Sequence, residues 1–427
     1  MSVLHFMKIN VWLILGILIS FLIIIDLYFY KGIRILLKKK RTEVKKIISF
    51  SYWAVSIFYY AIIIYFFIFH RWHRSVAEMS DIYYITGTFF LIYIPKIVFI
   101  IFHFIDDLIY LIRRLILLLK RLKTKKTQQS EEISRRAFLT RAGIIIASVP
   151  FASTLYGIVK GRFNFRVISQ KLYFPDLPES FNGIKIVQIS DIHMGSFYGY
   201  KNEVAEGIDL VNVQNPDYIF FTGDLVNNFT DELDGWFPLL IKLKAKQAKY
   251  SILGNHDYGD YYKWKTPEEK MLDHQNLINY HQTIGFQLLR NEHVRLENNN
   301  KSIVLAGVEN WGLHPFRQDG DIDKATEGLI DSDFIILLSH DPTHWDAKVL
   351  GRKNIRLTLS GHTHGMQMGI KLVGKEWSPA SFRYLRWAGL YNVEGQYLYV
   401  NRGFGFIGIP ARIGMPPEIT VIELYKR

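Results

Sequence analysis

Five short polar clusters, each placed directly after a short apolar run, constrain the fold of this chain more than any other feature. Each run is rich in β-branched or aromatic residues, as buried strands are, and the runs lie at 184–189, 218–222, 250–253, 334–338 and 355–359. The clusters that follow them are Ser190-Asp191-Ile192-His193, Gly223-Asp224-Leu225-Val226-Asn227, Gly254-Asn255-His256-Asp257, Ser339-His340-Asp341 and Gly361-His362-Thr363-His364.

The segments between the strands carry a helical pattern. Residues 202–213, 232–246 and 268–284 have apolar side chains at three- and four-residue spacing. Strands that alternate with helices predict right-handed crossovers and a largely parallel sheet covered on both faces. Ligands bind at the carboxyl ends of the strands in such sheets, so we expect all five clusters to lie along one edge.

The side chains in these clusters are those of a two-metal hydrolytic site. A carboxylate can bridge two cations, and imidazole and amide groups suit manganese, iron or zinc, whereas calcium prefers a cage made only of oxygen ligands. Two such ions about 3.5 to 4 Å apart lower the pKa of a bridging water and provide hydroxide near neutral pH. Ordinary strand-end caps would explain any single cluster, but five in this order favour a metal site.

From about residue 165 to residue 427, the chain resembles the calcineurin-like metallophosphoesterases through these five clusters. The resemblance implies a four-layer α/β sandwich that holds two divalent metal ions and hydrolyses phosphoric esters. It also implies that His256 is a catalytic histidine near the leaving-group oxygen. By position, Asp191, His193 and His364 match the ligands of one metal ion, Asn255, His340 and His362 match those of the other, and Asp224 matches the bridging ligand.

One cluster departs from the pattern of the protein phosphatases in this superfamily. Those enzymes extend it to Gly-Asp-x-x-Asp-Arg, whereas Asn227 and Asn228 hold the last two positions here. The departure argues against protein phosphatase activity. We expect Asn227 to accept a hydrogen bond from His256 and so to take part in catalysis. The alternative is a residue of a surface turn.

The C-terminal stretch resembles a narrower, bacterial group. Residues 399–405, with Pro410, Arg412 and 416–419, are similar to the ending of membrane-attached phosphoesterases, some of which have a twin-arginine signal. The stretch is also similar to that of membrane enzymes that cleave the pyrophosphate of UDP-diacylglucosamine. Arg402 and Arg412 are candidate ligands of a substrate phosphate, with structural ion pairing as the alternative for each.

The first 160 residues are predicted to form an all-helical transmembrane region. Residues 10–30, 48–69 and 82–104 are long and apolar enough to cross a bilayer, and 144–159 is shorter. Basic residues gather after the first and third segments, so both blocks should face the cytoplasm. Residues 104–122 are expected to form an amphipathic helix on the inner surface or a continuation of the third span, and 123–133 a linker.

A segment that begins Ser134-Arg135-Arg136 resembles a twin-arginine signal, and a basic anchor before an ordinary fourth span is the alternative. Both interpretations place the rest of the chain outside the cytoplasm if 144–159 crosses. We therefore expect a multi-pass protein of the bacterial inner membrane. Residues 1–160 would form its transmembrane region and residues 161–427 an extracytoplasmic catalytic domain.

The formal net charge of +13 does not require a nucleic-acid partner, because much of it lies in the two basic blocks, where anionic lipid is a sufficient partner. The chain has no cysteine, which excludes disulfides and thiolate ligands. The expected partners are the lipid bilayer and a phosphate-containing small molecule or lipid. The expected activity is hydrolysis of a phosphate ester or pyrophosphate by metal-activated hydroxide. A nuclease or soluble-substrate phosphodiesterase and an inactive membrane scaffold are the alternatives.

Overall fold

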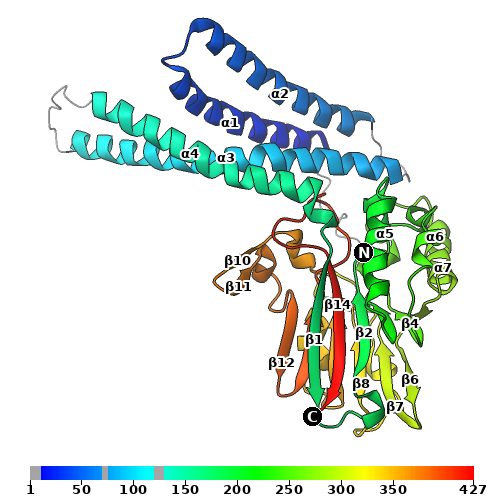
Figure 1. The fold of residues 1–427 in the computed structure, drawn as a ribbon. Coiled ribbons are helices and arrows are strands. Elements are labelled where there is room, and N and C mark those ends of the chain that lie inside the picture. The colour runs from blue at the N-terminus through cyan, green and yellow to red at the C-terminus, as the bar shows by residue number, and fades with distance from the viewer. Residues whose placement is uncertain (1–10, 70–75, 120–128) are drawn as a thin grey trace. The chain divides into compact units, whose positions relative to one another are not determined.

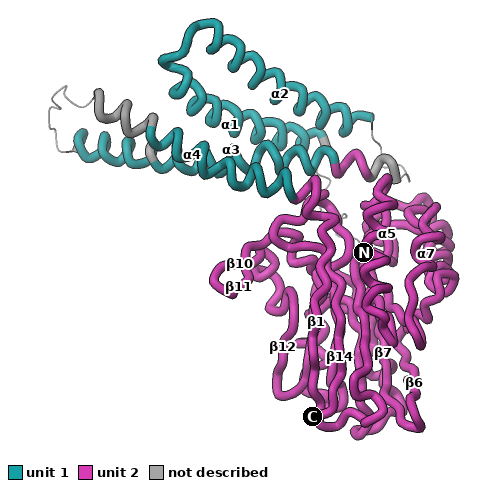
Figure 2. Tube along the Cα trace, in the orientation of Figure 1, with its two compact units in different colours: residues 1–73, 84–156 teal, residues 74–83, 157–427 magenta. Residues whose placement is uncertain are grey.

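The computed structural model describes residues 11–69, 76–119 and 129–427 (Figure 1). The chain divides into two compact units (Figure 2). One unit consists of residues 1–73 and 84–156, and the other of residues 74–83 and 157–427. The sequence-based boundary at residue 160 lies close to the point where the chain passes from the first unit to the second.

The described residues of the helical region form four long helices, each with a stretch that is long and apolar enough to cross a membrane. They are α1 (Val11–Leu37), α2 (Thr42–Phe69), α3 (Val76–Leu119) and α4 (Gln129–Val159). The predicted segment 144–159 is part of a longer apolar stretch, Phe138–Val159, whose 22 residues meet the length of a span. Of the two predictions for 104–122, continuation of the third span is confirmed as far as Leu119.

The predicted linker at 123–133 is only partly described. Residues 129–133 belong to α4, which corrects the prediction for that part, and 123–128 lie outside the described residues. The Arg135-Arg136 pair also lies within α4. A helix there is compatible with an anchor that continues directly into the fourth apolar stretch.

A buried ion pair stabilises the packing of the first three helices. Lys96 Nζ of α3 lies 2.5 Å from Asp26 Oδ1 of α1, and both residues are buried. Asp26 also accepts hydrogen bonds from the hydroxyl groups of Tyr52, Tyr60 and Tyr93. A charge inside an apolar helix bundle is costly unless a partner neutralises it. These four donors therefore explain how two charged residues are accommodated there.

The second unit is built on two six-stranded sheets (Figure 1). The strands of the first sheet are, in spatial order, β1 (Arg166–Phe174), β14 (Glu418–Lys426), β2 (Ile184–Ile189), β3 (Tyr218–Phe221), β4 (Ala248–Ser251) and β5 (Gln287–Leu288). Those of the second are β12 (Gly389–Val393), β13 (Gln396–Val400), β9 (Ile355–Ser360), β8 (Ile335–Leu338), β7 (Lys301–Gly307) and β6 (Glu292–Asn298). A separate hairpin pairs β10 (Ile370–Leu372) with β11 (Lys375–Trp377).

The two sheets pack face to face, with helices on their outer faces. Successive strand residues point to opposite faces, so Ile186 joins the core between the sheets while Val187 joins the core under the helices. The outer face of the first sheet is covered by α5 (Lys201–Val213) and α7 (Pro267–Thr283) through residues such as Val204 and Leu277. Trp345 and the short α8 (Ile322–Ala325) cover the second sheet. The predicted four-layer α/β sandwich is thus confirmed.

Two details of the sequence-based topology were wrong, namely the number of sheets and one crossover helix. The polar clusters follow strands of two sheets rather than one. The first sheet is largely parallel, as predicted, and β14 is antiparallel to β2 within it. Residues 232–246 do not form one crossover helix. They form a 3-10 turn (Thr230–Leu233) and the four-residue α6 (Phe237–Leu240). Gly235, with φ of +75°, lies between them and interrupts the helical backbone.

Candidate metal centre

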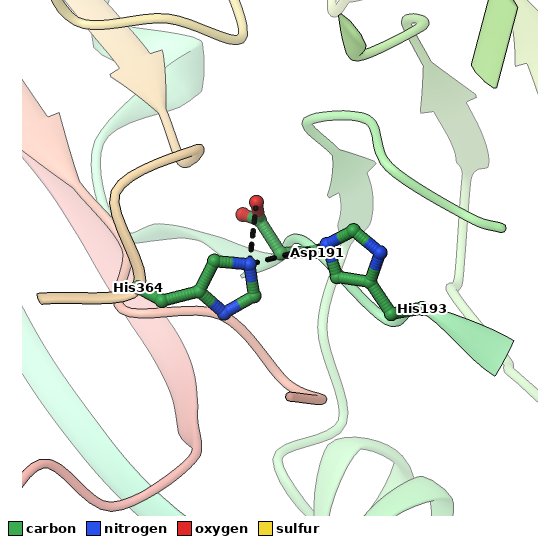
Figure 3. Close-up of side chains that lie close together, drawn as sticks. All are labelled: Asp191, His193 and His364. Atoms are coloured by element: carbon green, nitrogen blue, oxygen red, sulfur yellow. Dashed lines mark hydrogen bonds and ion pairs between the residues drawn. The ribbon is translucent and has the colours of Figure 1, made fainter. Parts of the chain in front are cut away.

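The five polar clusters meet where the carboxyl ends of the central strands of both sheets come together. A first group combines Asp191 and His193, which follow β2, with His364, which follows β9. Figure 3 shows the three side chains pointing toward one another. His364 Nε2 lies 3.3 Å from Asp191 Oδ1 and 3.1 Å from His193 Nε2. One potential ligand atom from each residue lies within 4.8 Å of the others.

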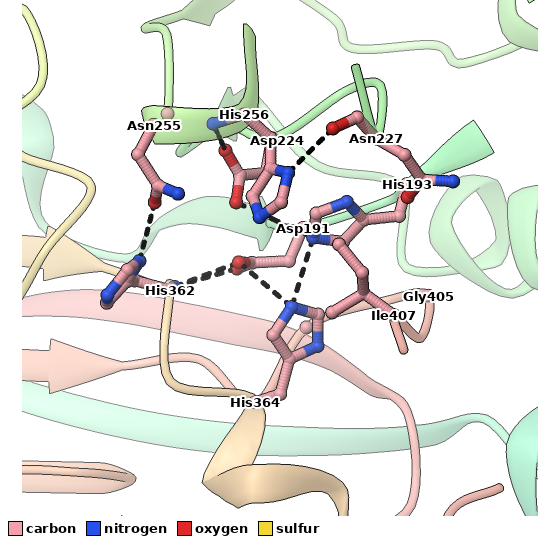
Figure 4. Close-up of polar contacts among 12 residues, drawn as sticks. Asp191, His193, Asp224, Asn227, Asn255, His256, His362, His364, Gly405 and Ile407 are labelled. Atoms are coloured by element: carbon pink, nitrogen blue, oxygen red, sulfur yellow. Dashed lines mark hydrogen bonds and ion pairs between the residues drawn. The ribbon is translucent and has the colours of Figure 1, made fainter. Parts of the chain in front are cut away.

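A second group lies beside the first and combines Asp224, His340 and His362. Asp224 Oδ2 is 3.2 Å from His340 Nε2 and 3.5 Å from His193 Nε2, so this one carboxylate faces both groups. Asn255 adds an amide oxygen, Oδ1, which lies 2.7 Å from His362 Nδ1 (Figure 4). The structure therefore brings together all seven residues that the sequence suggested as metal ligands.

Unusual backbone conformations at the strand ends point these side chains inward. The residues concerned have positive φ angles of 50° to 71° and are Asp191, His193, Asp224, His362 and His364. Such angles are uncommon for residues other than glycine and cluster at functional sites. A Cβ at position 223 would collide with the backbone of Gly254. Because Gly223 has no Cβ, the loops after β3 and β4 can approach each other closely.

Two buried carboxylates hold the loop that carries Asp224, and the sequence analysis assigned a role to neither. Asp257 accepts hydrogen bonds from the backbone N–H groups of Asp224 and Leu225. Glu232 accepts them from Asn227 and Asn228. Burial raises the pKa of Glu232 to about 8, although its backbone donors oppose that shift. Asp257 belongs to one of the five polar clusters but matches no ligand position. Its place in that cluster was the signal in the sequence for a supporting role.

The donor atoms and their electrostatics fit divalent metal ions. His340 Nδ1–H donates to the carbonyl of Thr222 over 2.7 Å, which turns Nε2 toward Asp224. Burial would lower the pKa of His340, but the negative charge of Asp224 raises it to about 10 when no metal is bound. The carboxylates therefore attract a cation to Nε2, and a metal ion would take the place of the proton there. Burial lowers the pKa of His193 to about 3, so its ring is neutral and its nitrogen can bind a metal. The ligand set contains two carboxylates, four imidazoles and one amide oxygen. Such a set suits manganese, iron or zinc.

His256 lies next to both groups, and its ring is oriented by a backbone group. Its Nδ1–H donates to the backbone carbonyl of Asn227 over 2.6 Å (Figure 4). The Asn227 side chain bonds instead to Ser196 Oγ. The predicted acceptor was the Asn227 amide, so the residue was right but the atom was wrong. A carbonyl oxygen carries a partial negative charge and can orient an imidazole without a carboxylate.

The structure places Arg402 and Arg412 in contacts within the protein. Arg402 forms ion pairs with Glu418, at 2.6 Å, and with Glu376. Arg412 is buried and donates to the carbonyls of Arg402 and Gly403, and its Nη2 lies 3.1 Å from His364 Nδ1. These contacts favour the structural alternative. Binding of substrate phosphate by either arginine stays a prediction.

A cavity of about 200 Å³ opens beside the metal ligands and His256. Two of its lining residues, Arg383 and Tyr384, were missed by the sequence analysis because no motif includes them. The Tyr384 hydroxyl lies 3.0 Å from His362 Nε2. The Arg383 guanidinium lies over the ring of Phe316, at 5.1 Å from its centroid. The cavity thus combines a cation, a phenol and an apolar wall beside the metal centre.

Comparison with known proteins agrees with this geometry. Residues 8–162 match the family described as "Probable Calcineurin-like phosphoesterase, transmembrane domain", and residues 184–366 match "Calcineurin-like phosphoesterase". The chain is 32% identical to "Uncharacterized metallophosphoesterase YkuE" of Bacillus subtilis (strain 168), over 58% of this chain and 81% of that protein. It is 30% identical to "Transmembrane protein with metallophosphoesterase domain" of Danio rerio, over 72% of this chain and 67% of that protein.

The family matches follow the division into a helical region and an α/β unit. This chain belongs to the calcineurin-like metallophosphoesterases, and it is a metal-dependent phosphoester hydrolase with an N-terminal transmembrane region.

Proposed function

We propose that this protein hydrolyses a phosphate ester or pyrophosphate bond, in a lipid-linked substrate, with two divalent metal ions. The main support is Asp224, whose Oδ2 lies within 3.5 Å of a histidine nitrogen of each group. One shared carboxylate between two sets of nitrogen and oxygen donors is the arrangement that two-metal hydrolases require. Bound ions would supply Lewis-acid activation of water and of the phosphoryl group.

The chain's own residues hold and orient this centre. In the proposal, Asp191, His193 and His364 hold one ion, and Asn255, His340 and His362 hold the other. Hydrogen bonds to their outer ring nitrogens fix the directions of two histidines: Thr222 accepts from His340, and Tyr384 contacts His362. Such outer contacts set ring orientation and strengthen metal binding.

His256 would act on the leaving group. The Asn227 carbonyl holds the proton on Nδ1, which leaves Nε2 of the same ring to face the cavity. In its protonated form, the ring can donate the Nε2 proton to the leaving-group oxygen. Metal analysis of the purified chain, combined with turnover of bis(para-nitrophenyl) phosphate, tests the proposed activity. Full metal content without turnover would favour the alternative of an inactive scaffold.

Arg383 is the residue that we expect to bind the substrate phosphate. Replacing it with alanine should raise KM about 10- to 100-fold, because a charge-assisted hydrogen bond contributes about 1.5 to 3 kcal/mol. Metal content should not change. Arg386→Ala is a matched control, because Arg386 is already paired with Asp346 at 3.0 Å. Steady-state kinetics on bis(para-nitrophenyl) phosphate measures the effect, and an unchanged KM in Arg383→Ala would exclude this role.

We further propose that the α/β unit lies outside the cytoplasm of a bacterial cell. Lys39, between α1 and α2, and Lys301, at the start of β7, are both exposed, and the chain has no native cysteine. In intact cells, an impermeant maleimide should therefore label Lys301→Cys and spare Lys39→Cys. The basic residues beside Lys39 should keep that loop inside. The reverse labelling pattern would place the catalytic unit in the cytoplasm.

A further inference from the structure

An exposed apolar surface lies next to the metal centre. After the ligand His364, the chain leaves the sandwich, forms the β10–β11 hairpin and a short turn (Pro379–Phe382), and returns at β12. The exposed fractions of its apolar residues range from 46% at Trp377 to 103% at Val373. We call this set the apolar hairpin surface, and its members are Ile370, Leu372, Val373, Trp377, Phe382 and Leu385.

The pairing of the two strands shows that these side chains form one patch. Ile370 lies opposite Trp377, and Leu372 lies opposite Lys375, so the four share one face of the hairpin. The Trp377 ring contacts the Phe382 ring, with centroids 5.9 Å apart. The patch therefore runs from the hairpin into the turn that follows it. A contiguous exposed apolar patch of this kind marks an interaction site.

The same segment also forms part of the catalytic cavity. Met366, just before the hairpin, and Arg383 and Tyr384, just after it, line the cavity beside His256. Ser378 Oγ donates to the carbonyl of Gly365 over 2.6 Å, which ties the base of the hairpin to the loop of His364. A ligand held by the apolar hairpin surface would thus present its polar end to the metal centre.

The tip of the hairpin is unusual for a turn in water. Val373 and Gly374 both have positive φ, of +48° and +77°, as the two central residues of a type I′ turn do. Asparagine or glycine is strongly preferred at the first of these positions, whereas a β-branched residue is rare there. Valine at this tip therefore has a conformational cost, and it also exposes an apolar side chain fully to solvent.

The charges around the patch indicate what covers it. Lys375 shares the apolar face of the hairpin, and a tryptophan lies at its base. Lys371 lies on the opposite face and pairs with Glu376 at 3.5 Å. Apolar, lysine and tryptophan side chains in one element are typical of the interface of an anionic bilayer. The α/β unit is also tethered to the membrane region by a short connection, because only residues 160–165 separate α4 from β1. Even fully extended, those residues span about 20 Å.

We propose that the apolar hairpin surface enters the interface of an anionic lipid bilayer and delivers the phosphate headgroup of an amphiphilic ester to the catalytic cavity. This inference rests on the proposed function and names the physical form of its substrate. Phosphate bound to Arg383 would lie at the headgroup level, while the acyl part stays in the bilayer beside Trp377 and Phe382. The enzyme would then act on substrates without extracting them.

Lipid contact is tested on the full chain in vesicles of phosphatidylcholine and phosphatidylglycerol. An environment-sensitive fluorophore is attached to Val373→Cys and, as a control, to Lys301→Cys, where the exposed lysine begins β7. The label at 373 should shift to the blue and be quenched by brominated lipids, and the label at 301 should show neither effect. Absence of quenching at 373 would overturn the proposal. Blue-shifted but unquenched label would assign the surface to a protein partner or a second copy of the chain.

A kinetic test uses a variant that should fold normally. Val373→Asn restores the residue that the turn prefers, and Phe382→Ser removes a side chain that is 83% exposed. The double variant should turn over hexadecyl para-nitrophenyl phosphate in vesicles about tenfold more slowly, as expected when one or two apolar side chains lose their interfacial contact. Its turnover of soluble bis(para-nitrophenyl) phosphate should be unchanged. Val213→Asn is the control, since Val213 is 77% exposed on α5.

The two substrates separate the two proposals. If the unmodified chain turns over neither, the proposed function fails. If it turns over both and the double variant slows on neither, the hydrolase stands and the lipid role of the hairpin is wrong. Equal slowing on both substrates would also overturn the lipid role, because it would show damage to the catalytic cavity itself.

Discussion

Replacing Asp224 with asparagine is expected to remove nearly all activity and to lower the metal content of the protein. The carboxylate of Asp224 is buried and faces His193 and His340 at 3.5 and 3.2 Å. Burial would raise its pKa, but His340 and His256 hold it well below its usual value, so the group is anionic. An amide of the same size offers one ligand oxygen and no charge to offset the repulsion between two cations.

Elemental analysis of the purified variant measures this effect independently of turnover. Asp209→Asn on α5 is a suitable control, because that carboxylate is exposed and lies outside the metal centre. The control should keep its metal and its activity. If Asp224→Asn also retained full metal occupancy and full turnover, the proposed two-metal centre would be wrong.

The second large effect is expected from His256→Ala, which should slow turnover without releasing metal. A positioned acid or base contributes roughly 100- to 10,000-fold to the rate, and we expect a loss in that range. The loss should be largest for alkyl esters, because a poor leaving group depends most on proton donation. Rates on para-nitrophenyl and alkyl esters, together with metal analysis, measure both parts of the prediction. An equal loss on both esters would argue against proton donation by His256.

The orientation of the His256 ring also predicts how much activity depends on the Asn227 side chain. Because the backbone carbonyl of Asn227 accepts the Nδ1 proton, the side chain is not needed for that contact. Asn227→Ala should therefore cost much less activity than His256→Ala. A comparable loss in the two variants would show that the amide, through Ser196 or directly, is part of the catalytic arrangement.

Features that depend on neighbouring residues could be predicted from the sequence. Strands and helices follow from side-chain periodicity, which is local, so β2 and α5 were found almost to the residue. The helix predicted at 232–246 failed because its apolar spacing comes from packing against the first sheet, while Gly235 breaks the backbone. The length of the fourth apolar stretch was underestimated, because the stretch begins at Phe138 and not at residue 144.

The amino-acid sequence alone therefore determined the class of chemistry, because the ligand types follow strand ends in an order that chance does not produce. It also determined the membrane attachment, since apolar length decides which helices can span. Only the tertiary structure decided that two sheets, not one, supply the ligands, and that a carbonyl orients His256. It likewise brought Arg383 and the apolar hairpin surface to the cavity. These contacts join residues far apart in the chain, and no local pattern encodes which backbone or side-chain atoms meet after folding.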